Sequence, residues 1–368
     1  MILCPDKLGE EEMINFKIGI LGTGTIAEKI AETIAKLDAF EVYAVGSRDA
    51  EKAAIFAEKF NITKSYGSYD ELVNDPEVEL VYVATPNQCH ADNAVLAINA
   101  GKPVLVEKPF SYNNKTTQDV IALAREKQVF CAEANWLRFS PLLKEAYKIT
   151  EAKEIGDIRL ITANLGYDLR MRERLIKADF AGGALLDLGI YPLTAVFTFM
   201  NSLPAAVSSA TVRLSTGVDA LDTIQMNFPN GKAASVLLSM VNQTDNRLTI
   251  YGTEGRLEID NIVHPEEVRV YNFKNEMTKK INLSDKEISG YEYEFIAARD
   301  AIIIGKPELP DVTHKDTISL LNFTDMLRRA WQIFYPLPGE ETLKNAPNPA
   351  TQVPPIPRDV PNNNTKNV

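Results

Sequence analysis

The stretch KIGILGTGTIA at residues 17–27 decides the fold of the first third of the chain. It reads as a buried strand, a glycine turn and a helix start, because apolar residues recur at helical spacing over residues 25–37. This order is typical of a unit that holds the pyrophosphate of a dinucleotide against the glycines and the helix amino terminus. The residues that we expect at the pyrophosphate are Gly22, Gly24, Thr25 and Ile26.

The residues after the second predicted strand, 40–45, indicate which dinucleotide binds, because that position lies at the adenosine ribose. The chain continues with Gly46-Ser47-Arg48-Asp49. Ser47 and Arg48 suit the 2′-phosphate of NADP, whereas Asp49 suits either a free ribose hydroxyl or the N-cap of the next helix. We therefore expect a preference for NADP. The alternative is that Ser47 and Arg48 are ordinary loop residues and that NAD binds as well.

Length, charge and hydropathy exclude several classes of function. The chain has 368 residues, which suggests two domains, and a formal net charge of −11, which argues against nucleic acid or an anionic membrane as a partner. No apolar stretch reaches the roughly 18 residues that a membrane span needs. We therefore expect a small-molecule substrate, with neither nucleic acid nor membrane as a partner.

The cysteines and the first residues indicate the compartment. Cys4, Cys89 and Cys131 are scattered and odd in number, so we expect no disulfide framework, no metal site and a cytoplasmic location. Residues 1–12 lack the basic start and apolar core of a signal peptide. Met13 lies close to the first strand and is an alternative start to Met1.

Alternating strand and helix patterns define a first domain. Apolar runs read as strands at 16–21, 40–45, 80–84, 103–107 and 129–134, and helical patterns lie between them at 25–37, 50–60, 90–100 and 115–127. Strands that alternate with helices predict a doubly wound parallel sheet. We expect this α/β Rossmann domain to span residues 13–134.

The pattern changes after a helix expected at 141–153. Longer β-type runs joined by tight turns predict an open, mostly antiparallel sheet, with strands at 158–167, 206–214, 219–228, 232–240 and 246–260. Helices near 292–304 and 315–335 complete this α+β domain, which we expect to span residues 135–337. The remainder, 338–368, is rich in Pro and Asn and reads as a disordered tail.

Four further motifs allow a family to be recognised. They are Ala84-Thr85-Pro86-Asn87 with His90, Glu107-Lys108-Pro109, Glu133-Ala134-Asn135-Trp136-Leu137-Arg138-Phe139, and GGALLDLGIY at residues 182–191. With the glycine turn and in this order, they make residues 14–335 resemble the Gfo/Idh/MocA oxidoreductases. Within that family the chain is most similar to the branch of dimeric dihydrodiol dehydrogenases and NADP-dependent D-xylose dehydrogenases. The resemblance implies a Rossmann domain, a second domain on an open sheet, and a homodimer formed through that sheet.

The resemblance also implies a catalytic lysine at Lys108 and an acid–base group at Tyr191, where inositol dehydrogenases carry His. Lys108 follows strand 103–107 at its carboxyl end, where doubly wound sheets place ligands, and its ammonium suits a substrate oxygen. A phenol with a pKa of about 10 is a weak base at neutral pH, so we expect Lys108 to lower the pKa of Tyr191. Asp187 is expected to hold Lys108 or a substrate hydroxyl. The alternative is that Asp187 caps a helix and Tyr191 only packs.

The remaining candidates are expected around the nicotinamide and its ribose. By position or by resemblance, we expect cofactor contacts from Thr85, Pro86, Asn87, His90, Glu107, Lys108, Trp136 and Arg138. Three of these have alternative interpretations: His90 as a helix start, Trp136 as a core aromatic and Arg138 as part of the domain junction. Pro109 makes the Lys108–Pro109 bond a candidate for the cis form. Asn135 stands where close relatives often carry a bulky apolar residue, a departure that affects the pocket.

Together these features predict an NAD(P)-dependent oxidoreductase that prefers NADP. The substrate class is a sugar, polyol or cyclic diol, with oxidation of an aldose at C1 and oxidation of a trans-dihydrodiol as the two competing reactions. One alternative is a non-catalytic NAD(P)-binding regulator on the same scaffold, which the presence of Lys108, Tyr191 and Asp187 disfavours. A second alternative is a hydrolase or lyase that uses the dinucleotide internally.

Overall fold

The computed structural model describes residues 15–283 and 290–345. Its first part is a sheet of six parallel strands in the order β3-β2-β1-β4-β5-β6. The strands are β1 (Phe16–Leu21), β2 (Phe40–Gly46), β3 (Lys64–Tyr66), β4 (Leu80–Val83), β5 (Val104–Glu107) and β6 (Cys131–Ala134). Every residue of β4, β5 and β6 is buried, as expected for parallel strands covered on both faces, although β6 is an edge strand of this sheet.

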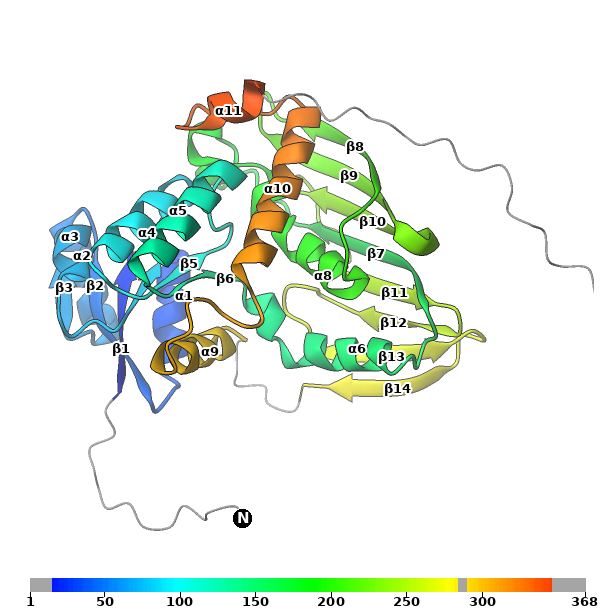
Figure 1. Ribbon diagram of the computed structural model, residues 1–368, viewed down its shortest axis with the longest axis horizontal. Helices are drawn as coiled ribbons and strands as arrows, with labels where there is room; N and C mark the ends of the chain where they lie inside the picture. The colour runs from blue at the N-terminus through cyan, green and yellow to red at the C-terminus, as the bar shows by residue number, and fades with distance from the viewer. Residues whose placement is uncertain (1–14, 284–289, 346–368) are drawn as a thin grey trace, which may run out of the picture.

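Helices cover the two faces of this sheet (Figure 1). They are α1 (Thr25–Ile34), α2 (Ala50–Phe60), α3 (Tyr69–Val73), the 3-10 turn η1 (Asn87–Cys89), α4 (His90–Asn99) and α5 (Asn114–Lys127). Side-chain caps start α2, α3 and α5, because Asp49, Ser68 and Asn113 accept hydrogen bonds from backbone amides in the first turn. The predicted parallel α/β sheet is confirmed, although the short β3 and α3 were not predicted.

The second part is a sheet of eight strands in the order β14-β13-β12-β11-β7-β10-β9-β8. The strands are β7 (Ile158–Gly166), β8 (Ala206–Arg213), β9 (Asp219–Phe228), β10 (Lys232–Ser239), β11 (Leu248–Gly252), β12 (Gly255–Ile259), β13 (Glu267–Asn272) and β14 (Met277–Asn282). Only the β7–β10 pair is parallel. The mostly antiparallel open sheet is therefore confirmed, and the run 246–260 forms two strands linked at Thr253-Glu254-Gly255, as its sequence predicts, whereas β13 and β14 were not predicted.

Short connections set the register of the antiparallel strands. The turn η5 (Pro229–Gly231) joins β9 to β10, with Asn230 in the left-handed region at φ 65°. Asn is one of the few residues that adopts this conformation readily. Lys232 consequently pairs with Phe228, and alternate side chains of both strands face the helices.

Helices pack against one face of the second sheet (Figure 1). The 3-10 turn η2 (Trp136–Phe139) leads into α6 (Pro141–Glu151), and the 3-10 turns η3 (Glu173–Leu175) and η4 (Ala178–Phe180) lead into α7 (Ala184–Asp187) and α8 (Ile190–Met200). Leu188 and Gly189 separate α7 from α8, and Pro192 is the third residue of α8, where a missing amide costs no helical bond. No helix of the described ranges packs against the opposite face.

The most apolar helical segment of the chain is the bent pair formed by residues 178–187 and 190–200. These two helical pieces meet at 44° and together reach the length and hydropathy of a membrane span, by length and composition only. No single helix in the ranges 15–283 and 290–345 reaches the length and hydropathy that a membrane span needs. Nine of the eleven α8 residues are buried in the protein core.

The chain then returns to the first sheet. Helix α9 (Glu292–Ile303) packs on β4 through Phe295, whose ring centroid lies 5.1 Å from that of Tyr82. Helix α10 (His314–Ala330) begins at a capping box formed by Thr313 and Asp316 and lies against α5. The two sheets are thus held together by helices from the end of the chain.

The ordered chain extends beyond the expected boundary at residue 337. Helix α11 (Glu340–Asn345) follows, and its Glu340 is buried. Both carboxylate oxygens of Glu340 accept hydrogen bonds from the guanidinium of Arg328, at 2.9 and 3.1 Å, and that guanidinium is fully buried. Residues 338–345 therefore do not belong to a disordered tail, because a buried positive charge needs this carboxylate. The rest of the expected tail lies outside the described residues.

Candidate active site

The turn between β1 and α1 has the shape that a pyrophosphate requires. Gly22 has φ +111°, and a Cβ on it would lie 2.8 Å from the carbonyl oxygen of Ala84. A Cβ on Gly24 would instead meet no atom of the described chain within 4 Å, so the space beside it is open. Gly24 is the N-cap of α1 and has no side chain to bond the first amides, which include those of Thr25 and Ile26. The residues present therefore fit a bound dinucleotide phosphate.

The end of β2 carries the residues expected at the ribose. Ser47 is buried, and its hydroxyl accepts a hydrogen bond from the amide of Asp49 at 3.2 Å. The carboxylate of Asp49 accepts from the amides of Glu51 and Lys52, which confirms that it caps α2. Arg48 is exposed, and its charge opposes the rise that burial causes in the pKa of Tyr69. Arg48 and Tyr69 thus lie beside one another, with the guanidinium accessible to an anionic ligand.

Lys108, Asp187 and Tyr191 come together at the carboxyl end of β5. The Nζ of Lys108 donates a hydrogen bond of 2.9 Å to the backbone oxygen of Asp187. The same ammonium lies 4.7 Å from the ring centroid of Tyr191, over its face. The Lys108–Pro109 peptide bond is cis, as the sequence suggested. Residues from the first sheet and from the α7–α8 segment therefore meet in one place.

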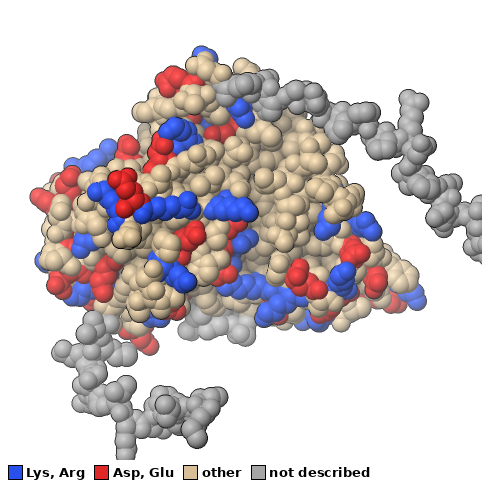
Figure 2. Space-filling view, in the orientation of Figure 1, with Lys and Arg blue, Asp and Glu red and all other residues tan. Residues whose placement is uncertain are grey.

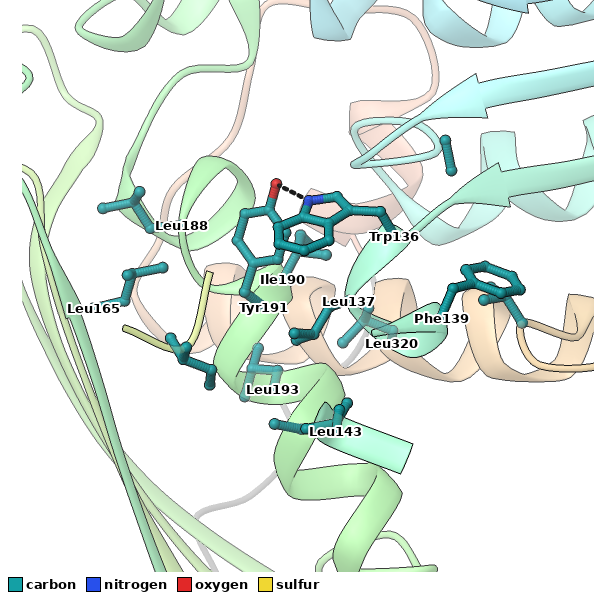
Figure 3. Packing of buried hydrophobic residues seen from close by; sticks show 14 of the residues in the cluster. Trp136, Leu137, Phe139, Leu143, Leu165, Leu188, Ile190, Tyr191, Leu193 and Leu320 are labelled. Carbon is teal, nitrogen blue, oxygen red and sulfur yellow. Dashed lines mark hydrogen bonds between the residues drawn. The ribbon is translucent and has the colours of Figure 1, made fainter. Parts of the chain in front are cut away.

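Trp136 forms the wall beside Tyr191. Its Nε1 donates a hydrogen bond of 3.3 Å to the Tyr191 hydroxyl, and Figure 3 shows the indole nitrogen directed toward that oxygen. The indole also packs against two further rings, since the ring centroids of His264 and Tyr291 each lie 5.1 Å from its own. Trp136 and Tyr191 are 2% and 6% exposed, so the hydroxyl lies in a largely dry environment.

The protonation of Tyr191 differs from the expectation. Burial raises the pKa of Tyr191 well above its ordinary value, and the negative charge of Glu107 adds to the rise. The expectation that Lys108 lowers this pKa is wrong for the chain without ligands, because the ammonium bonds a carbonyl and faces the ring instead of the hydroxyl. Tyr191 is therefore a neutral phenol at neutral pH, which suits a proton donor.

Asp187 keeps its negative charge by a different contact from the one expected. Its carboxylate accepts two hydrogen bonds of 3.2 Å from Arg174, while only its backbone oxygen contacts Lys108. Burial alone would raise the pKa of Asp187, but the charges of Lys108 and Arg174 hold it below its ordinary value. Asp187 thus holds Lys108, as expected, through the main chain.

Glu107 precedes Lys108 and is held by two hydrogen bonds within the protein. Its carboxylate accepts hydrogen bonds from the Tyr82 hydroxyl at 2.5 Å and from the Lys108 amide at 3.0 Å. Burial raises the pKa of Glu107, and the charge of Lys108 partly offsets that rise. Because its two oxygens are held by protein donors, Glu107 fixes the backbone that carries Lys108.

Residues after β4 form the floor beside the glycine turn. Thr85 and Asn87 are buried, and Pro86 precedes the turn η1. The two ring nitrogens of His90 lie 2.7 Å from the carbonyl oxygens of Thr85 and Pro109. Burial lowers the pKa of His90 to about 4. His90 is the first residue of α4 and joins the β4 and β5 loops, so its ring does not face a cofactor.

Arg138 does not join this group. Its guanidinium donates to the backbone oxygen of Asp311 at 2.8 Å and to the hydroxyl of Thr198. These contacts tie η2 to α8 and to the segment before α10. These contacts, and not a place beside Lys108 and Tyr191, account for the Arg138 guanidinium, and both partners belong to the second part of the chain, as Arg138 does.

Several neighbours of the site were not predicted. Arg174 lies in a charged surface loop, and His264 lies between β12 and β13, so neither position carried a pattern that indicated the site. Tyr291 precedes α9, and Glu294, in its first turn, is fully buried with no partner for its carboxylate among the described residues. Their places depend on the return of the chain to the first sheet. Within the described ranges, no group of three His, Cys, Asp or Glu side chains could hold a metal ion.

Comparison with protein families identifies the two parts. The family described as "Oxidoreductase family, NAD-binding Rossmann fold" matches residues 16–134, and the "GFO/IDH/MocA C-terminal domain" matches residues 143–258. The chain belongs to the Gfo/Idh/MocA family. As a member of this oxidoreductase family with an NAD-binding domain, it is an NAD(P)-dependent oxidoreductase.

Curated relatives of this Gfo/Idh/MocA protein are named as enzymes. Trans-1,2-dihydrobenzene-1,2-diol dehydrogenase of Mus musculus is 33% identical over 324 residues, which are 86% of this chain and 97% of that protein. The enzyme of the same name from Xenopus tropicalis is 32% identical, over 87% of this chain and 99% of its own length. These names agree with the resemblance found in the sequence.

Solved structures share the fold. The aldose-aldose oxidoreductase of Caulobacter crescentus has a TM-score of 0.79 at 22% identity, over 86% of this chain and 98% of its own. A 3-ketoreductase from Actinomadura kijaniata, crystallised with NADP and TDP-benzene, has a TM-score of 0.76 at 23% identity, over 85% and 97%. At these identities the likeness concerns the fold alone.

Proposed function

We propose that this Gfo/Idh/MocA protein interconverts an alcohol and a carbonyl group on a cyclic diol or a sugar, with NADP as the preferred cofactor. The observation that carries the proposal is the meeting of Lys108, Asp187 and Tyr191 beside the carboxyl end of β5. A relative that acts on trans-dihydrodiols aligns over nearly the whole described chain, which supports a diol as the first substrate to test. Oxidation of an aldose at C1 is the competing reaction.

Tyr191 is proposed as the acid–base residue. Its buried hydroxyl is neutral, so in the direction of carbonyl reduction it donates its proton to the developing alkoxide. In the opposite direction it must accept the alcohol proton, and a cation near the phenolate favours that step. The Lys108 ammonium is the nearest cation to its ring, and a substrate oxygen between the two groups would draw the ammonium toward the hydroxyl.

Lys108 and its supports are proposed to orient the substrate oxygen. The ammonium already uses one of its three protons on the backbone oxygen of Asp187, which fixes its direction. Arg174 holds the Asp187 carboxylate, and Trp136 fixes the phenol, so both reacting groups are positioned before substrate arrives. The nicotinamide, when bound, accepts or supplies the hydride.

The cofactor would be held by residues at three places. Gly22, Gly24, Thr25 and Ile26 are proposed for the pyrophosphate, Ser47 and Arg48 for the 2′-phosphate, and Thr85, Pro86, Asn87 and Glu107 for the nicotinamide side. The accessible guanidinium of Arg48 supports a preference for NADP, because an arginine pairs with a phosphate dianion and gains little from a ribose hydroxyl.

A homodimer through the second sheet is part of this proposal. Side chains at alternate positions of β7 and β10 point away from the helices; they include the apolar Leu160 and Leu237 beside the uncharged polar Thr162, Asn164 and Ser235. No described helix covers this face. Leu237→Arg is expected to convert a dimer to a monomer in light scattering, whereas Ile303→Arg, at an exposed position of α9, is not.

The scattered cysteines support the expectation of a cytoplasmic location.

Binding and turnover test the proposed function. The purified protein is titrated with NADPH and with NADH by fluorescence, and reduced nicotinamide is then followed by absorbance with a panel of trans-dihydrodiols, aldoses and polyols. Tighter NADPH binding and turnover of a dihydrodiol or an aldose are expected. Cofactor binding without turnover of any panel member would contradict the proposed substrate class.

A further inference from the structure

A second cavity lies behind the candidate active site. Its volume is about 720 Å³, which is within the range of small-molecule sites. It is lined by residues of η2, α6, α8 and the start of α10, and none of Lys108, Trp136, Asp187 or Tyr191 lines it. Asn135 and Thr194, which are joined by a hydrogen bond, line the cavity, and each is close in sequence to a site residue, Trp136 and Tyr191 respectively. The cavity is therefore close to the active site but distinct from it.

The inner end of the cavity offers an incompletely bonded amide. Asn135 is 2% exposed, and its Nδ2 donates a hydrogen bond of 2.9 Å to the Thr194 hydroxyl. Its Oδ1 has no partner among the described residues, and turning the amide over would leave the NH₂ group in that position instead. A buried amide atom without a partner is costly. A ligand hydroxyl satisfies either orientation, because a hydroxyl both donates and accepts.

Glu133 adds acceptors at the same end. It is buried, and its carboxyl group accepts hydrogen bonds from the Phe110 amide at 3.0 Å and from the Thr317 hydroxyl at 3.1 Å. Each carboxyl oxygen has room for a second hydrogen bond. The inner end therefore suits a ligand that carries hydroxyl groups, and a bare hydrocarbon would leave the Asn135 amide unpaired.

The cavity is lined by three lysines and, beside them, by Asp311 and Asp316, so the lysines exceed these two carboxylates by one. Lys144 and Lys148 are one turn apart on α6, Lys315 faces them from α10, and all three are exposed. Lys144 pairs with Asp311 at 3.2 Å and Lys148 with Glu145 at 2.5 Å. Lys315 makes no ion pair within the described residues. Figure 2 shows Lys and Arg side chains at the lower end of α10, with Asp and Glu side chains next to them, beside a broad uncharged area over α8.

This positive rim contrasts with the rest of the molecule. The chain as a whole has a formal net charge of −11, so a long-range field does not explain why cations collect at one opening. Between the rim and the inner end, the walls are apolar, with Leu143, Phe197 and Leu320 among them. The order from the surface inward is therefore positive charge, apolar wall and hydroxyl-binding amide.

We propose that this cavity binds a small hydroxylated organic anion, with its charged group at Lys148 and Lys315 and a hydroxyl at Asn135. Sugar phosphates and hydroxylated aromatic acids share this chemistry. The assignment concerns a site apart from Lys108 and Tyr191, so it stands whether or not the proposed function is correct.

Calorimetric titration of the full chain, saturated with NADP, tests the proposal. The probes are glucose 6-phosphate and 4-hydroxybenzoate, with inorganic phosphate and benzoate as partners that lack the hydroxyls. If 4-hydroxybenzoate binds, it is expected to bind about fivefold more tightly than benzoate, because the two differ by one hydroxyl and hence by one hydrogen bond. If glucose 6-phosphate binds, it is expected to bind at least about fivefold more tightly than inorganic phosphate, which lacks all of the sugar hydroxyls. Binding of either probe supports the site, and which of the two binds distinguishes a sugar phosphate from an aromatic acid.

Rim variants locate the binding. Lys148→Glu with Lys315→Glu is expected to weaken the bound probe about tenfold. The charge-matched control, Lys274→Glu with Lys306→Glu, changes two exposed lysines away from the cavity and is expected to leave the affinity within twofold. Ser319→Phe, which places a ring in the cavity from α10, should also abolish binding. Absence of binding by both probes, or binding that the rim variants and Ser319→Phe leave unchanged, would overturn the proposal.

Discussion

The Nζ of Lys108 donates a 2.9 Å hydrogen bond to the backbone oxygen of Asp187, across 79 positions of the chain. Lys108 follows β5 of the first sheet, and Asp187 is the last residue of α7 in the second part. The bond uses the main chain, so the Asp187 carboxylate remains on Arg174. The direction of the Lys108 ammonium thus depends on where α7 ends. The negative charge of the Asp187 carboxylate is held separately, by its ion pair with Arg174.

Because Lys108 is held by the main chain of Asp187 and not by its carboxylate, substitutions of Lys108 and of Asp187 should lower activity to different extents. Lys108→Met should lower kcat by about 10³-fold or more, because it removes the only contact proposed for the substrate oxygen besides Tyr191. Asp187→Asn keeps the backbone bond and weakens only the pair with Arg174, so a loss of about tenfold is expected. Steady-state kinetics compare the two, with Lys115→Met on the exposed side of α5 as control. Equal losses would contradict the role of the main-chain bond.

Removal of the Tyr191 hydroxyl should affect chemistry and spare cofactor binding. Tyr191→Phe keeps the ring under Lys108 and removes the proton that the reaction needs, so kcat should fall about 10²- to 10⁴-fold. NADPH affinity, measured by fluorescence titration, should remain within about twofold. Tyr251→Phe, a half-exposed tyrosine of β11, is the matched control. A parallel loss of NADPH affinity would refute the assignment.

Arg48 should determine the choice between the two cofactors. Arg48→Ala removes a charge that a 2′-phosphate uses and a ribose hydroxyl does not, so NADPH should bind about tenfold or more weakly while NADH changes little. Titrations of both cofactors measure the ratio, and Lys52→Ala on the same surface provides the control. The cofactor assignment fails if both affinities fall alike.

Glu133 should make stability depend on pH. Burial raises the pKa of Glu133 from 4.5 in the unfolded chain to about 7, so the folded state favours the protonated form. Stability from this group is present below pH 4.5 and is lost as pH rises through 7, by up to roughly 3 kcal/mol. Glu133→Gln removes the titration; its Oε1 can still accept from the Phe110 amide, and its NH₂ group would donate to the Thr317 hydroxyl instead of accepting from it. Urea unfolding at pH 4.5 and 8 should show the variant gaining relative stability at the higher pH, and a pH-independent difference would refute this.

The contact of Glu340 with Arg328 should be essential to the last helices. Glu340→Ala leaves the fully buried guanidinium with only Asp325 as a charged partner and removes an acceptor from Asn113. A loss of about 3 kcal/mol in the free energy of unfolding is expected. Glu341→Ala, next to it and exposed, should change stability by less than about 0.5 kcal/mol. Urea unfolding of both variants gives the comparison.

Local patterns predicted five of the six strands of the first sheet and singled out Lys108, Asp187 and Tyr191, which the structure brings together. Gly22 and the strand before it carry their own signal, and Lys108 and Tyr191 lie in runs whose residue order indicates the family. The short strand β3 and the five-residue α3 gave no periodic signal, because three to five residues do not complete a pattern. Their existence follows from packing against β2.

Contacts between distant segments account for the features that sequence patterns did not predict. Arg138 follows the site strand in sequence, but η2 turns its side chain toward Asp311 and Thr198. The pKa of Tyr191 depends on burial by α9 and η2, which no spacing within residues 182–191 reports. The expected tail begins too early because the contact between Glu340 and the buried Arg328 holds α11 against the protein. The sequence around Glu340 does not show that Arg328 is buried.

The stacking of Trp136 has an optical consequence. The chain contains only two tryptophans, and Trp331 donates its indole hydrogen bond to Ser209 on β8, the edge strand of the second sheet. Trp136 instead touches Tyr191, His264 and Tyr291. In a Trp331→Phe background, all tryptophan emission would come from Trp136, beside the reacting groups. Energy transfer from Trp136 to reduced nicotinamide would then report binding and release of the coenzyme without any added dye.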